Sequence, residues 1–258
     1  MRLDKYLAEH GFSSRAKAVH ALERGLVTVN GRAAKASAEI KDGDIVEVKE
    51  EPVSFVSEGG FKLYKALVEF SEDITGKVFA DLGASTGGFT DCLLRFGAAR
   101  VYAADVGESQ LDESLRADAR VVVMDRVNAR YLDSVSFPEK IDGVTADLSF
   151  ISLKLILPAI EKILAEGGCA FVLVKPQFEC EGKGQSKRGI VTDARIRSRV
   201  LQGICEFAAG LGLQPANVTT APRRERKNIE YVLLLKKEKT AFVPISDLLK
   251  RASQCECE

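Results

Sequence analysis

The sequence predicts a two-domain protein: a small α+β domain, then a larger α/β domain built on a doubly wound, mainly parallel sheet. The 258-residue length allows about two domains at ~100–200 residues each. Residues 1–50 have the pattern of helices followed by short strands. From residue 77 onward, apolar strands alternate with amphipathic helices, which is typical of crossover connections between parallel strands.

The small domain is defined by caps and turns. Asp4 is expected to cap the first helix, and Gly25 is expected to end the second, because glycine readily adopts the left-handed conformation of a helix C-terminus. Asn30-Gly31 is a strong hairpin signal, since both turn positions favour positive φ. The expected elements are a helix through Leu7, a helix from Ser13 or Ser14 to about Arg24, and strands at 26–29 and 45–48.

The large domain is expected to follow a linker that contains Pro52, since proline interrupts regular structure. The proposed boundaries are 1–50 for the small domain, 51–60 for the linker, 61–240 for the large domain and 241–258 for a C-terminal tail. Strands are expected at 78–81, 101–105, 121–124, 144–147, 170–175 and 231–235, and helices near 88–96, 152–165 and 192–210.

Composition excludes several classes of function. Thirty-seven basic residues balance 37 acidic ones, which argues against indiscriminate coating of nucleic acid. No apolar run approaches the ~18–20 residues of a membrane-spanning helix, and the charged N-terminus does not resemble a signal peptide. The six cysteines form no C-x-x-C pair, which favours reduced thiols in the cytoplasm. Cys255 and Cys257 have no histidine nearby, so no metal site is expected.

Histidine is confined to His10 and His20. A serine or cysteine nucleophile activated by histidine is therefore not expected in the large domain. Proton transfer there must use lysine, carboxylates, tyrosine or cysteine.

A glycine-rich loop follows the first strand of the large domain and leads into a helix, in the sequence D-L-G-A-S-T-G-G-F-T. Such a loop lets the backbone approach a ligand closely. It lacks the Gly-Lys-Ser/Thr of a P-loop, and Ser85 replaces the middle glycine of a dinucleotide fingerprint. Asp81 suits a cationic methionine group, and Asp105 at the next strand end suits ribose hydroxyls. These features favour S-adenosyl-L-methionine over NAD, bound through Asp81, Gly83, Ser85, Gly87, Gly88 and Asp105.

Four polar residues lie in apolar surroundings next to expected strands. They are Lys62, Asp147, Lys175 and Glu230. A lysine at the end of a central strand is costly unless it is paired, and ligands bind at the carboxyl ends of strands in doubly wound sheets. We therefore expect these four side chains to form a catalytic cluster.

Two basic clusters suit an RNA substrate. One includes Lys187 and Arg188, and the other includes Arg223 and Arg224 just before the last strand. Because both flank the expected catalytic cluster, we interpret them as phosphate contacts.

The N-terminal pattern, R-L-D-K-Y-L…S-R-A-K-A…G-L-V-T-V-N-G…I-K-D-G-D-I-V, resembles the RNA-binding module named after ribosomal small-subunit protein four. The resemblance covers about residues 2–48. In that family the second helix and the hairpin form the RNA surface. The matching basic residues here are Arg15, Lys17, Arg24 and Arg32.

Residues 59–236 resemble the RrmJ/FtsJ-type RNA 2′-O-methyltransferases, and nearly the whole chain resembles the TlyA family, through D-L-G-A-S-T-G-G-F-T and V-K-P-Q-F-E. The resemblance implies a Rossmann-like methyltransferase fold and a Lys–Asp–Lys–Glu tetrad, matched by Lys62, Asp147, Lys175 and Glu230. It also implies transfer from S-adenosyl-L-methionine to a ribose 2′-hydroxyl, of cytidine, in ribosomal RNA or ribosomal subunits. Asp125 would contact the adenosine side of the cofactor.

Two positions depart from the family pattern. Glu58 replaces the usual arginine of Ser-Arg-Gly-Gly, and Asp125-Arg126-Val127-Asn128 replaces Glu-Arg-Thr-Asn. Lys175 could act as a neutral base or as a charged orienting group, and the sequence leaves both open. The alternatives in function are a membrane-acting hemolysin, an assembly factor with a non-catalytic transferase domain, and a nicotinamide dehydrogenase. The sequence also leaves open the oligomeric state, the target nucleotide and which subunit carries it.

Overall fold

The computed structural model describes residues 1–10, 12, 15–23, 25–41, 43–48, 54–180, 182, 184–222, 226–238 and 243–257, with the backbone alone for residues 16, 17, 20 and 23. The chain forms two compact units, Met1–Ser54 and Phe55–Glu258. Among the described residues, no helix has both the length and the apolar character needed to cross a membrane.

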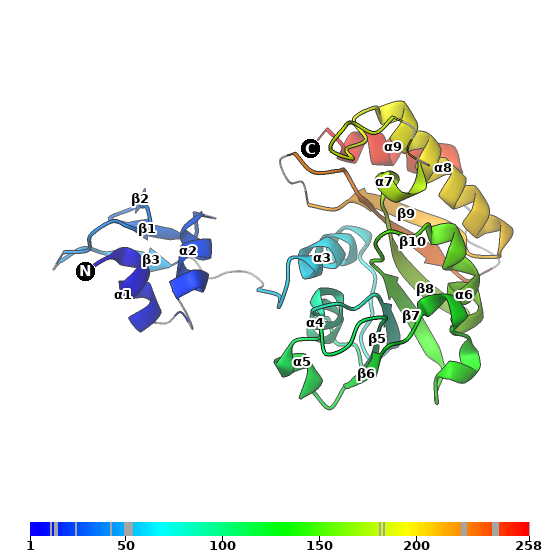
Figure 1. Ribbon diagram of the computed structural model, residues 1–258, viewed down its shortest axis with the longest axis horizontal. Coiled ribbons are helices and arrows are strands. Elements are labelled where there is room, and N and C mark those ends of the chain that lie inside the picture. The colour runs from blue at the N-terminus through cyan, green and yellow to red at the C-terminus, as the bar shows by residue number, and fades with distance from the viewer. Residues whose placement is uncertain are drawn as a thin grey trace. The chain divides into compact units, whose positions relative to one another are not determined.

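The first unit packs two helices on a three-stranded antiparallel sheet (Figure 1). Its elements are α1 (Leu3–Glu9), α2 (Arg15–Glu23), β1 (Val27–Val29), β2 (Arg32–Ala33) and β3 (Val46–Val48), with strand order β2-β1-β3. Leu3, Leu7 and Leu22 lie in its buried core. Asn30 and Gly31 have φ values of 51° and 73°, and they connect the paired residues Val29 and Arg32 in the predicted two-residue hairpin turn.

The prediction that Asp4 caps the first helix is wrong. Helix α1 begins at Leu3, and Arg2 is its N-cap residue. The Asp4 carboxylate instead accepts hydrogen bonds from the side chains of Arg2 and Arg15, and these bonds lower the pKa of Asp4. The carboxylate therefore ties α1 to the start of α2.

The second unit contains the seven-stranded, mainly parallel sheet that the sequence predicts. Its strand order is β6-β5-β4-β7-β8-β10-β9, and β10 alone runs antiparallel to both of its neighbours, β8 and β9. The strands are β4 (Val78–Leu82), β5 (Arg100–Asp105), β6 (Val121–Asp125), β7 (Ile141–Ala146), β8 (Leu164–Val174), β9 (Gln214–Thr220) and β10 (Tyr231–Lys236).

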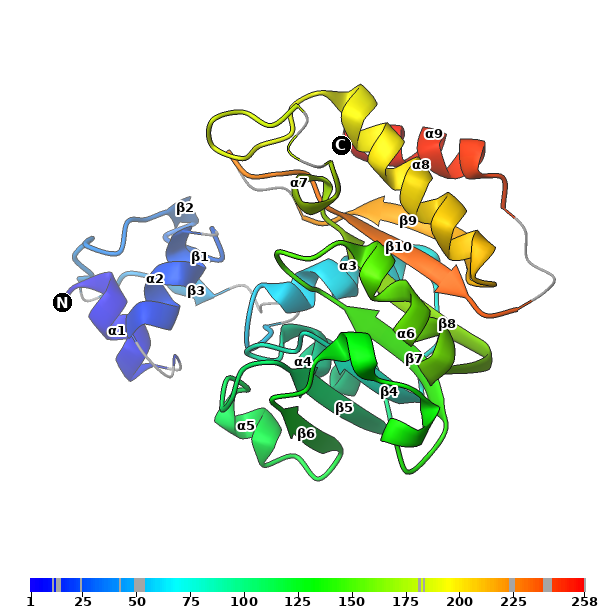
Figure 2. The ribbon, with the colours of Figure 1, turned by 45° about the vertical axis from the view of Figure 1, so that its right-hand side comes forward.

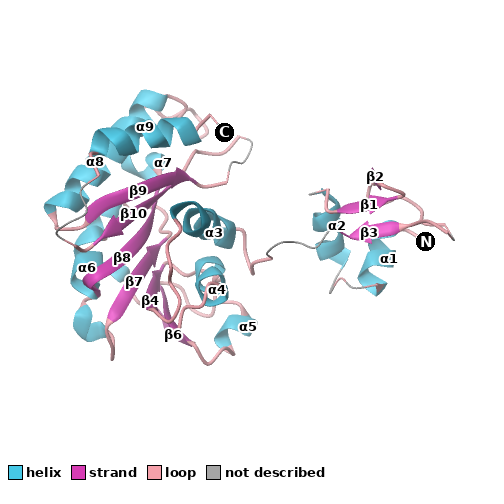
Figure 3. Ribbon diagram, turned by 180° about the vertical axis from the view of Figure 1, so that it is seen from behind, coloured by secondary structure: helices cyan, strands magenta, loops and turns pink. Residues whose placement is uncertain are grey.

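Helices cover both faces of this sheet (Figure 3). The helices are α3 (Gly59–Phe70), α4 (Gly88–Arg95), α5 (Glu113–Arg116), α6 (Leu157–Ile163), α7 (Pro176–Glu179), α8 (Ala194–Gly210) and α9 (Ile245–Cys255); short 3₁₀ turns lie at Ala129–Tyr131, Ser134–Ser136 and Leu153–Leu155. Alternate strand residues belong to different cores. Phe171 packs with α3 and α4, whereas Val172 packs with α6 and α8, as expected for a strand buried on both faces.

Two helices occupy segments that the sequence analysis assigned otherwise. Helix α3 begins at Gly59, within the expected linker 51–60, and buries Leu63 and Leu67. Helix α9 lies within the expected tail 241–258 and buries Leu248 and Ala252 in the core shared with α8. Helix α9 thus contributes to the packing of the second unit.

Candidate active site

The glycine-rich loop between β4 and α4 is shaped by close packing. Gly83 has a φ of 80°, and a Cβ there would lie 2.9 Å from the Asp147 carbonyl oxygen. Gly87 has a φ of 96°, and a Cβ there would lie 2.2 Å from a Leu115 methyl carbon. Only glycine fits either position without displacing its neighbours. The loop therefore lies directly against the segment that carries Asp147.

Asp105, at the end of β5, holds this loop in place. Its Oδ2 accepts a hydrogen bond from the Ser85 backbone N–H at 2.9 Å, and its Oδ1 accepts one from Gly107 N–H at 2.8 Å. Ser85 has a positive φ of 49°, which is uncommon for a residue with a side chain. The Asp105 carboxylate fixes that conformation.

Asp81 lies beneath the loop. Its side chain is buried, and its two oxygens accept hydrogen bonds from the hydroxyls of Thr90 and Thr145, each at 2.7 Å. Burial raises the pKa of Asp81 to about 6, although the two threonines oppose the shift. Asp81 is thus buried and bonded to α4 and β7 through the two threonines, and its predicted contact with the cofactor stays a prediction.

Asp125, at the end of β6, is also engaged within the protein. Its carboxylate pairs with Arg116 at 3.0 Å and accepts a hydrogen bond from Ser109 N–H. The Arg116 side chain lowers the pKa of Asp125.

Two neighbouring cavities lie at the carboxyl edge of the sheet. The smaller cavity has a volume of about 300 Å³ and is lined by the glycine loop. The larger cavity has a volume of about 750 Å³ and lies toward the start of β10. The smaller is lined by Ser57, Gly59, Lys62, Gly83, Ala84, Ser85, Thr86, Gly88, Phe89, Asp147, Ser149 and Lys175. The larger is lined by Lys62, Ser149, Lys175, Gln177, Ala221, Pro222, Lys227, Asn228, Ile229 and Glu230. Lys62, Ser149 and Lys175 belong to both walls.

The four residues predicted as a catalytic cluster form one ion-pair network. Asp147 lies between the two lysines, with its Oδ1 2.6 Å from Lys175 Nζ and its Oδ2 3.1 Å from Lys62 Nζ. Lys62 Nζ also lies 3.0 Å from Glu230 Oε2. Helix α3 supplies Lys62, and the ends of β7, β8 and β10 supply the other three. The fold therefore brings together residues up to 168 positions apart.

The network is largely withdrawn from solvent. The Lys175 side chain is 8% exposed, and the side chains of Lys62, Asp147 and Glu230 are about one-fifth exposed. Burial alone lowers the pKa of Lys62, but Asp147 and Glu230 outweigh it, and the net pKa is raised. Lys62 is thus held as an ammonium ion between two carboxylates.

Ser149 and Gln177, which the sequence analysis did not single out, complete the network. Lys175 Nζ donates a hydrogen bond to Ser149 Oγ at 3.0 Å, and Gln177 Nε2 donates one to Glu230 Oε1 at 3.0 Å. Both residues adjoin predicted ones, in Asp147-Leu148-Ser149 and Lys175-Pro176-Gln177. Their short distance from the tetrad in the sequence is the signal that could have identified them.

An aromatic pair lies beside Lys175. Phe150 is 91% exposed and has a φ of 62°, which is strained for a bulky residue. Its ring centroid lies 5.0 Å from that of Phe178, and Lys175 Nζ lies 5.8 Å from the Phe178 ring centroid. Phe178 therefore lies in contact with the exposed Phe150 ring and near the buried Lys175 amine.

The predicted RNA-contacting residues have different surroundings. Lys187 and Arg188 are exposed on the loop between α7 and α8, and Arg32 is exposed on β2. Arg15 is half exposed and pairs with Asp4 at 2.7 Å. The side chain of Lys17 is not described, and Arg24, Arg223 and Arg224 lie outside the described residues. Glu58, at the family's arginine position, is exposed at the start of α3.

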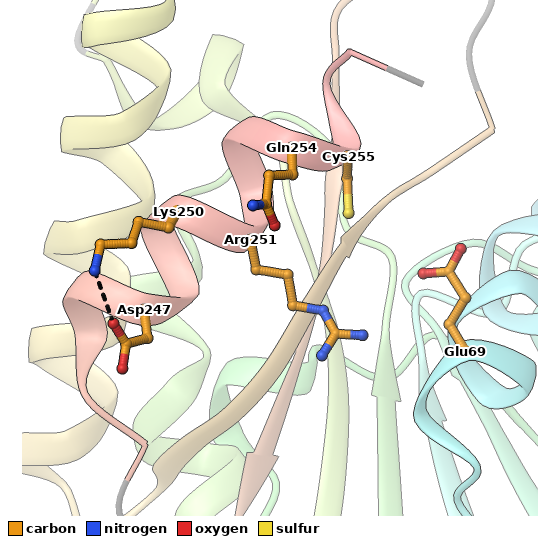
Figure 4. Close-up of a pocket in the computed structure, with 6 residues that line it drawn as sticks. All are labelled: Glu69, Asp247, Lys250, Arg251, Gln254 and Cys255. Carbon is orange, nitrogen blue, oxygen red and sulfur yellow. Dashed lines mark hydrogen bonds and ion pairs between the residues drawn. The ribbon is translucent and has the colours of Figure 1, made fainter.

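A further depression of about 700 Å³ lies between α3 and α9. Figure 4 shows Arg251 extending from α9 toward α3, and Lys250 paired with Asp247. The Lys250–Asp247 ion pair measures 3.2 Å, and the Arg251 guanidinium lies 5.9 Å from the ring centroid of Phe70. The described lining of this depression contains no predicted site residue. Across the described ranges, no group of three histidine, cysteine, aspartate or glutamate side chains is arranged to hold a metal ion.

Comparison with known families identifies the architecture. Residues 55–237 match the FtsJ-like methyltransferase family, and residues 1–46 match the S4 domain. This chain belongs to the FtsJ-like methyltransferase family. The predicted Rossmann-like fold and the resemblance to this family are confirmed.

Relatives of this FtsJ-like methyltransferase span most of its length. The 16S/23S rRNA (cytidine-2′-O)-methyltransferase TlyA of Mycobacterium tuberculosis is 40% identical over 240 residues, which cover 91% of this chain and 89% of the relative. Hemolysin A of Brachyspira hyodysenteriae is 42% identical over 236 residues, 90% of this chain and 98% of the relative. A solved structure of a Streptococcus thermophilus protein is 37% identical, with a TM-score of 0.72, and covers 100% of this chain and 97% of its own.

Proposed function

We propose that this protein transfers a methyl group from S-adenosyl-L-methionine to a ribose 2′-hydroxyl of ribosomal RNA, at cytidine. One observation carries the proposal: Lys62 and Lys175 lie on the wall shared by two cavities, one formed by a glycine loop and the other beside basic residues. This arrangement suits a donor and an acceptor that meet at the tetrad. The specificity for cytidine in ribosomal RNA follows the name of the M. tuberculosis relative.

The residues of the smaller cavity fit the cofactor. Its glycine loop exposes backbone to the cavity at Gly83 and Gly88. Asp105, which supports this loop from the end of β5, accepts hydrogen bonds from two backbone N–H groups, and a carboxylate has about four acceptor positions. Asp105 thus retains capacity for ribose hydroxyls. S-adenosyl-L-methionine, when bound, supplies an electrophilic methyl group. In this proposal Asp81 and Asp125 support the loop and its neighbouring strand end.

The chain's own residues orient and polarise the acceptor. Asp147 and Ser149 occupy two N–H directions of the Lys175 amine. When this amine is neutral, its lone pair is the third direction and takes the proton of the substrate hydroxyl as the methyl group is transferred. Lys62, held as an ammonium ion by Asp147 and Glu230, places positive charge near the oxygen as its proton leaves. Lys175 is therefore the residue that we place against the 2′-hydroxyl, with the carboxylates as its orienting groups.

The surroundings of the tetrad suit a nucleotide. Phe150 offers an exposed ring on which a base can stack, a contact worth ~1–3 kcal/mol in single-stranded nucleic acid recognition. Lys227 lines the larger cavity, and Lys187 and Arg188 lie on an adjoining loop. The S4 domain supplies further substrate affinity in this proposal. We expect it to contact phosphates and position the RNA.

Calorimetry and methyl-transfer assays test this function. We expect the purified protein to bind S-adenosyl-L-methionine and to transfer labelled methyl groups to ribosomal RNA. Lys140→Gln, an exposed change before β7, serves as the matched control for Lys175→Met. Binding of NAD without binding of S-adenosyl-L-methionine, or equal transfer by wild type and Lys175→Met, would contradict the proposal.

Membrane lysis is a second candidate, favoured by the name Hemolysin A of the Brachyspira relative. An erythrocyte lysis assay with the same preparations separates the two functions. Lysis by wild type and Lys175→Met alike, without methyl transfer by either protein, would favour the second candidate.

A further inference from the structure

We propose that the loop at residues 184–193 is a preformed arm that contacts RNA phosphates beside the larger cavity, and that Asn228 and the Arg197–Glu256 pair position it. The inference deepens the proposed function and rests on it for the nature of the substrate. Figure 2 shows this loop, between α7 and α8, beside the segment that leads into β10.

Asn228 connects the loop to the catalytic strand. Its Oδ1 accepts a hydrogen bond from Val191 N–H at 2.8 Å, and its Nδ2 donates one to the Gly189 carbonyl oxygen at 3.0 Å. Both ends of the amide are therefore used on one loop. Asn228 also lines the larger cavity, two residues before Glu230. The segment that carries Glu230 therefore also holds the loop.

Arg197, on α8, holds the same loop through two of its carbonyl oxygens. Its Nη1 donates hydrogen bonds to the carbonyl oxygens of Val191 at 3.1 Å and Thr192 at 2.8 Å. The residue is only 6% exposed, and a buried guanidinium is costly unless it is paired. Glu256 provides that pairing, and Tyr231, which follows Glu230, donates its hydroxyl to the same carboxylate.

The loop is also ordered internally. Gln185 bridges to Val191, and Ser186 N–H donates a hydrogen bond to the Ile190 carbonyl oxygen at 2.9 Å. The Gln185 side chain donates to the backbone oxygen of Gln177 at 2.6 Å. Because Gln177 lines the larger cavity, both ends of the loop are fixed to the cavity wall.

The tip of the loop presents two cations to solvent. Lys187 and Arg188 are exposed, and neither side chain has an ion-pair partner among the residues that the structure describes. Holding such cations on a rigid support reduces the entropy lost when they bind. Contacts to phosphates position a nucleic acid without reading its sequence. We therefore assign the arm to the phosphates that flank the target nucleotide.

Salt-dependent binding tests the arm and its support together. The affinity of the full-length protein for purified 16S and 23S ribosomal RNA is measured by fluorescence anisotropy between 50 and 200 mM salt. Losing two phosphate contacts should reduce the slope of log affinity against log salt by about 1.4–1.8. Between 50 and 200 mM salt, the variant's affinity should therefore fall by a factor about 7- to 12-fold smaller than the factor for wild type. We expect this for Lys187→Gln/Arg188→Gln. The matched control, Lys140→Gln/Lys162→Gln, changes two exposed lysines that precede β7 and β8 and should retain the wild-type slope.

Asn228→Ala should reduce the slope to a similar extent although it removes no charge. Added to Lys187→Gln/Arg188→Gln, it should reduce the slope no further, because both changes act through one arm. Glu256→Gln, which acts through Arg197, is the second variant if Asn228→Ala does not fold. The inference would be overturned if folded Asn228→Ala and Glu256→Gln kept the wild-type slope. It would also be overturned if the slope changes of Asn228→Ala and Lys187→Gln/Arg188→Gln were fully additive.

Binding does not depend on methyl transfer, so the two proposals fail separately. A wild-type protein that binds RNA through the arm but transfers no methyl group would contradict the proposed function alone. Normal methyl transfer by the wild-type protein, together with an unchanged salt slope in Lys187→Gln/Arg188→Gln, would contradict only the proposed role of the arm.

Discussion

Asp147→Asn is the change with the sharpest structural consequence. The substitution keeps the shape of the side chain but removes the charge that two lysines share, at 2.6 Å from Lys175 and 3.1 Å from Lys62. Lys62 keeps its pairing with Glu230 at 3.0 Å. Lys175 keeps a hydrogen bond to Ser149 but no carboxylate partner within the described part of the chain.

The expected cost follows from the burial of Lys175. Removing one partner of a buried ion pair typically costs ~3–5 kcal/mol. The Asp147 side chain is 20% exposed and the new amide oxygen still accepts a hydrogen bond, so we place the loss near the lower bound, about 3 kcal/mol. For a domain of ~150–250 residues, this lowers Tm by about 6–12 °C.

A double-mutant cycle identifies the cause of that loss. Lys175→Met leaves Asp147 paired with Lys62, so it should cost about 1 kcal/mol. In Asp147→Asn/Lys175→Met the remaining lysine of the tetrad, Lys62, keeps Glu230 as its partner, so about 2 kcal/mol of the loss should be recovered. Urea unfolding followed by circular dichroism measures each variant, since the chain contains no tryptophan. Asp147→Asn as stable as wild type, or strictly additive losses, would refute the reasoning.

Three further predictions concern turnover, pH and RNA affinity. Lys175→Met and Lys175→Arg should both lower turnover by about 10²- to 10⁴-fold while calorimetry shows nearly unchanged S-adenosyl-L-methionine affinity; near-normal turnover in either would remove Lys175 from the mechanism. Because burial raises the pKa of Asp81 from 3.8 to about 6, the folded state holds this proton to higher pH than the unfolded chain, and the residue's contribution to stability falls as pH rises between these values. Urea unfolding should therefore show Asp81→Asn gaining about 2 kcal/mol relative to wild type from pH 4 to pH 7, and a constant difference would contradict this. Replacing Arg15, Lys17 and Arg32 with alanine should weaken ribosomal RNA binding and flatten its salt dependence, without changing cofactor affinity. Anisotropy titrations that match wild type would contradict an RNA-binding role of the S4 domain.

The sequence predicted the sheet because its strands are short apolar runs with polar ends. Lys175 and Asp147 follow such runs directly, so parallel pairing alone brings them to one edge. Helix α3 was not predicted, since two glycines at its start are poor helix formers, and its burial of Leu63 and Leu67 compensates. Strand β9 was also missed, because Gln214–Thr220 is largely polar and pairs with β10 only in the folded chain.

The orientation of particular side chains could not be predicted. Asp81 is the penultimate residue of β4, and its side chain meets Thr90 on α4, so alternation along the strand directs it beneath the loop. The contacts of Gln177 with Glu230 and of Asn228 with Val191 join residues 53 and 37 positions apart. Such pairings depend on the register of β8 with β10 and on the path of a loop, and local sequence patterns do not encode either.

Mapping ribose 2′-O-methyl groups in ribosomal RNA tests the central claim most directly. The maps should come from cells that carry the wild-type protein, cells that lack it, and cells that carry Lys175→Met at equal abundance. We predict a 2′-O-methylated nucleotide, a cytidine, that is present with the wild-type protein and absent from the other two. Identical maps from all three, or a methyl group that persists with Lys175→Met, would contradict the assignment of the tetrad as the site of 2′-O-methyl transfer.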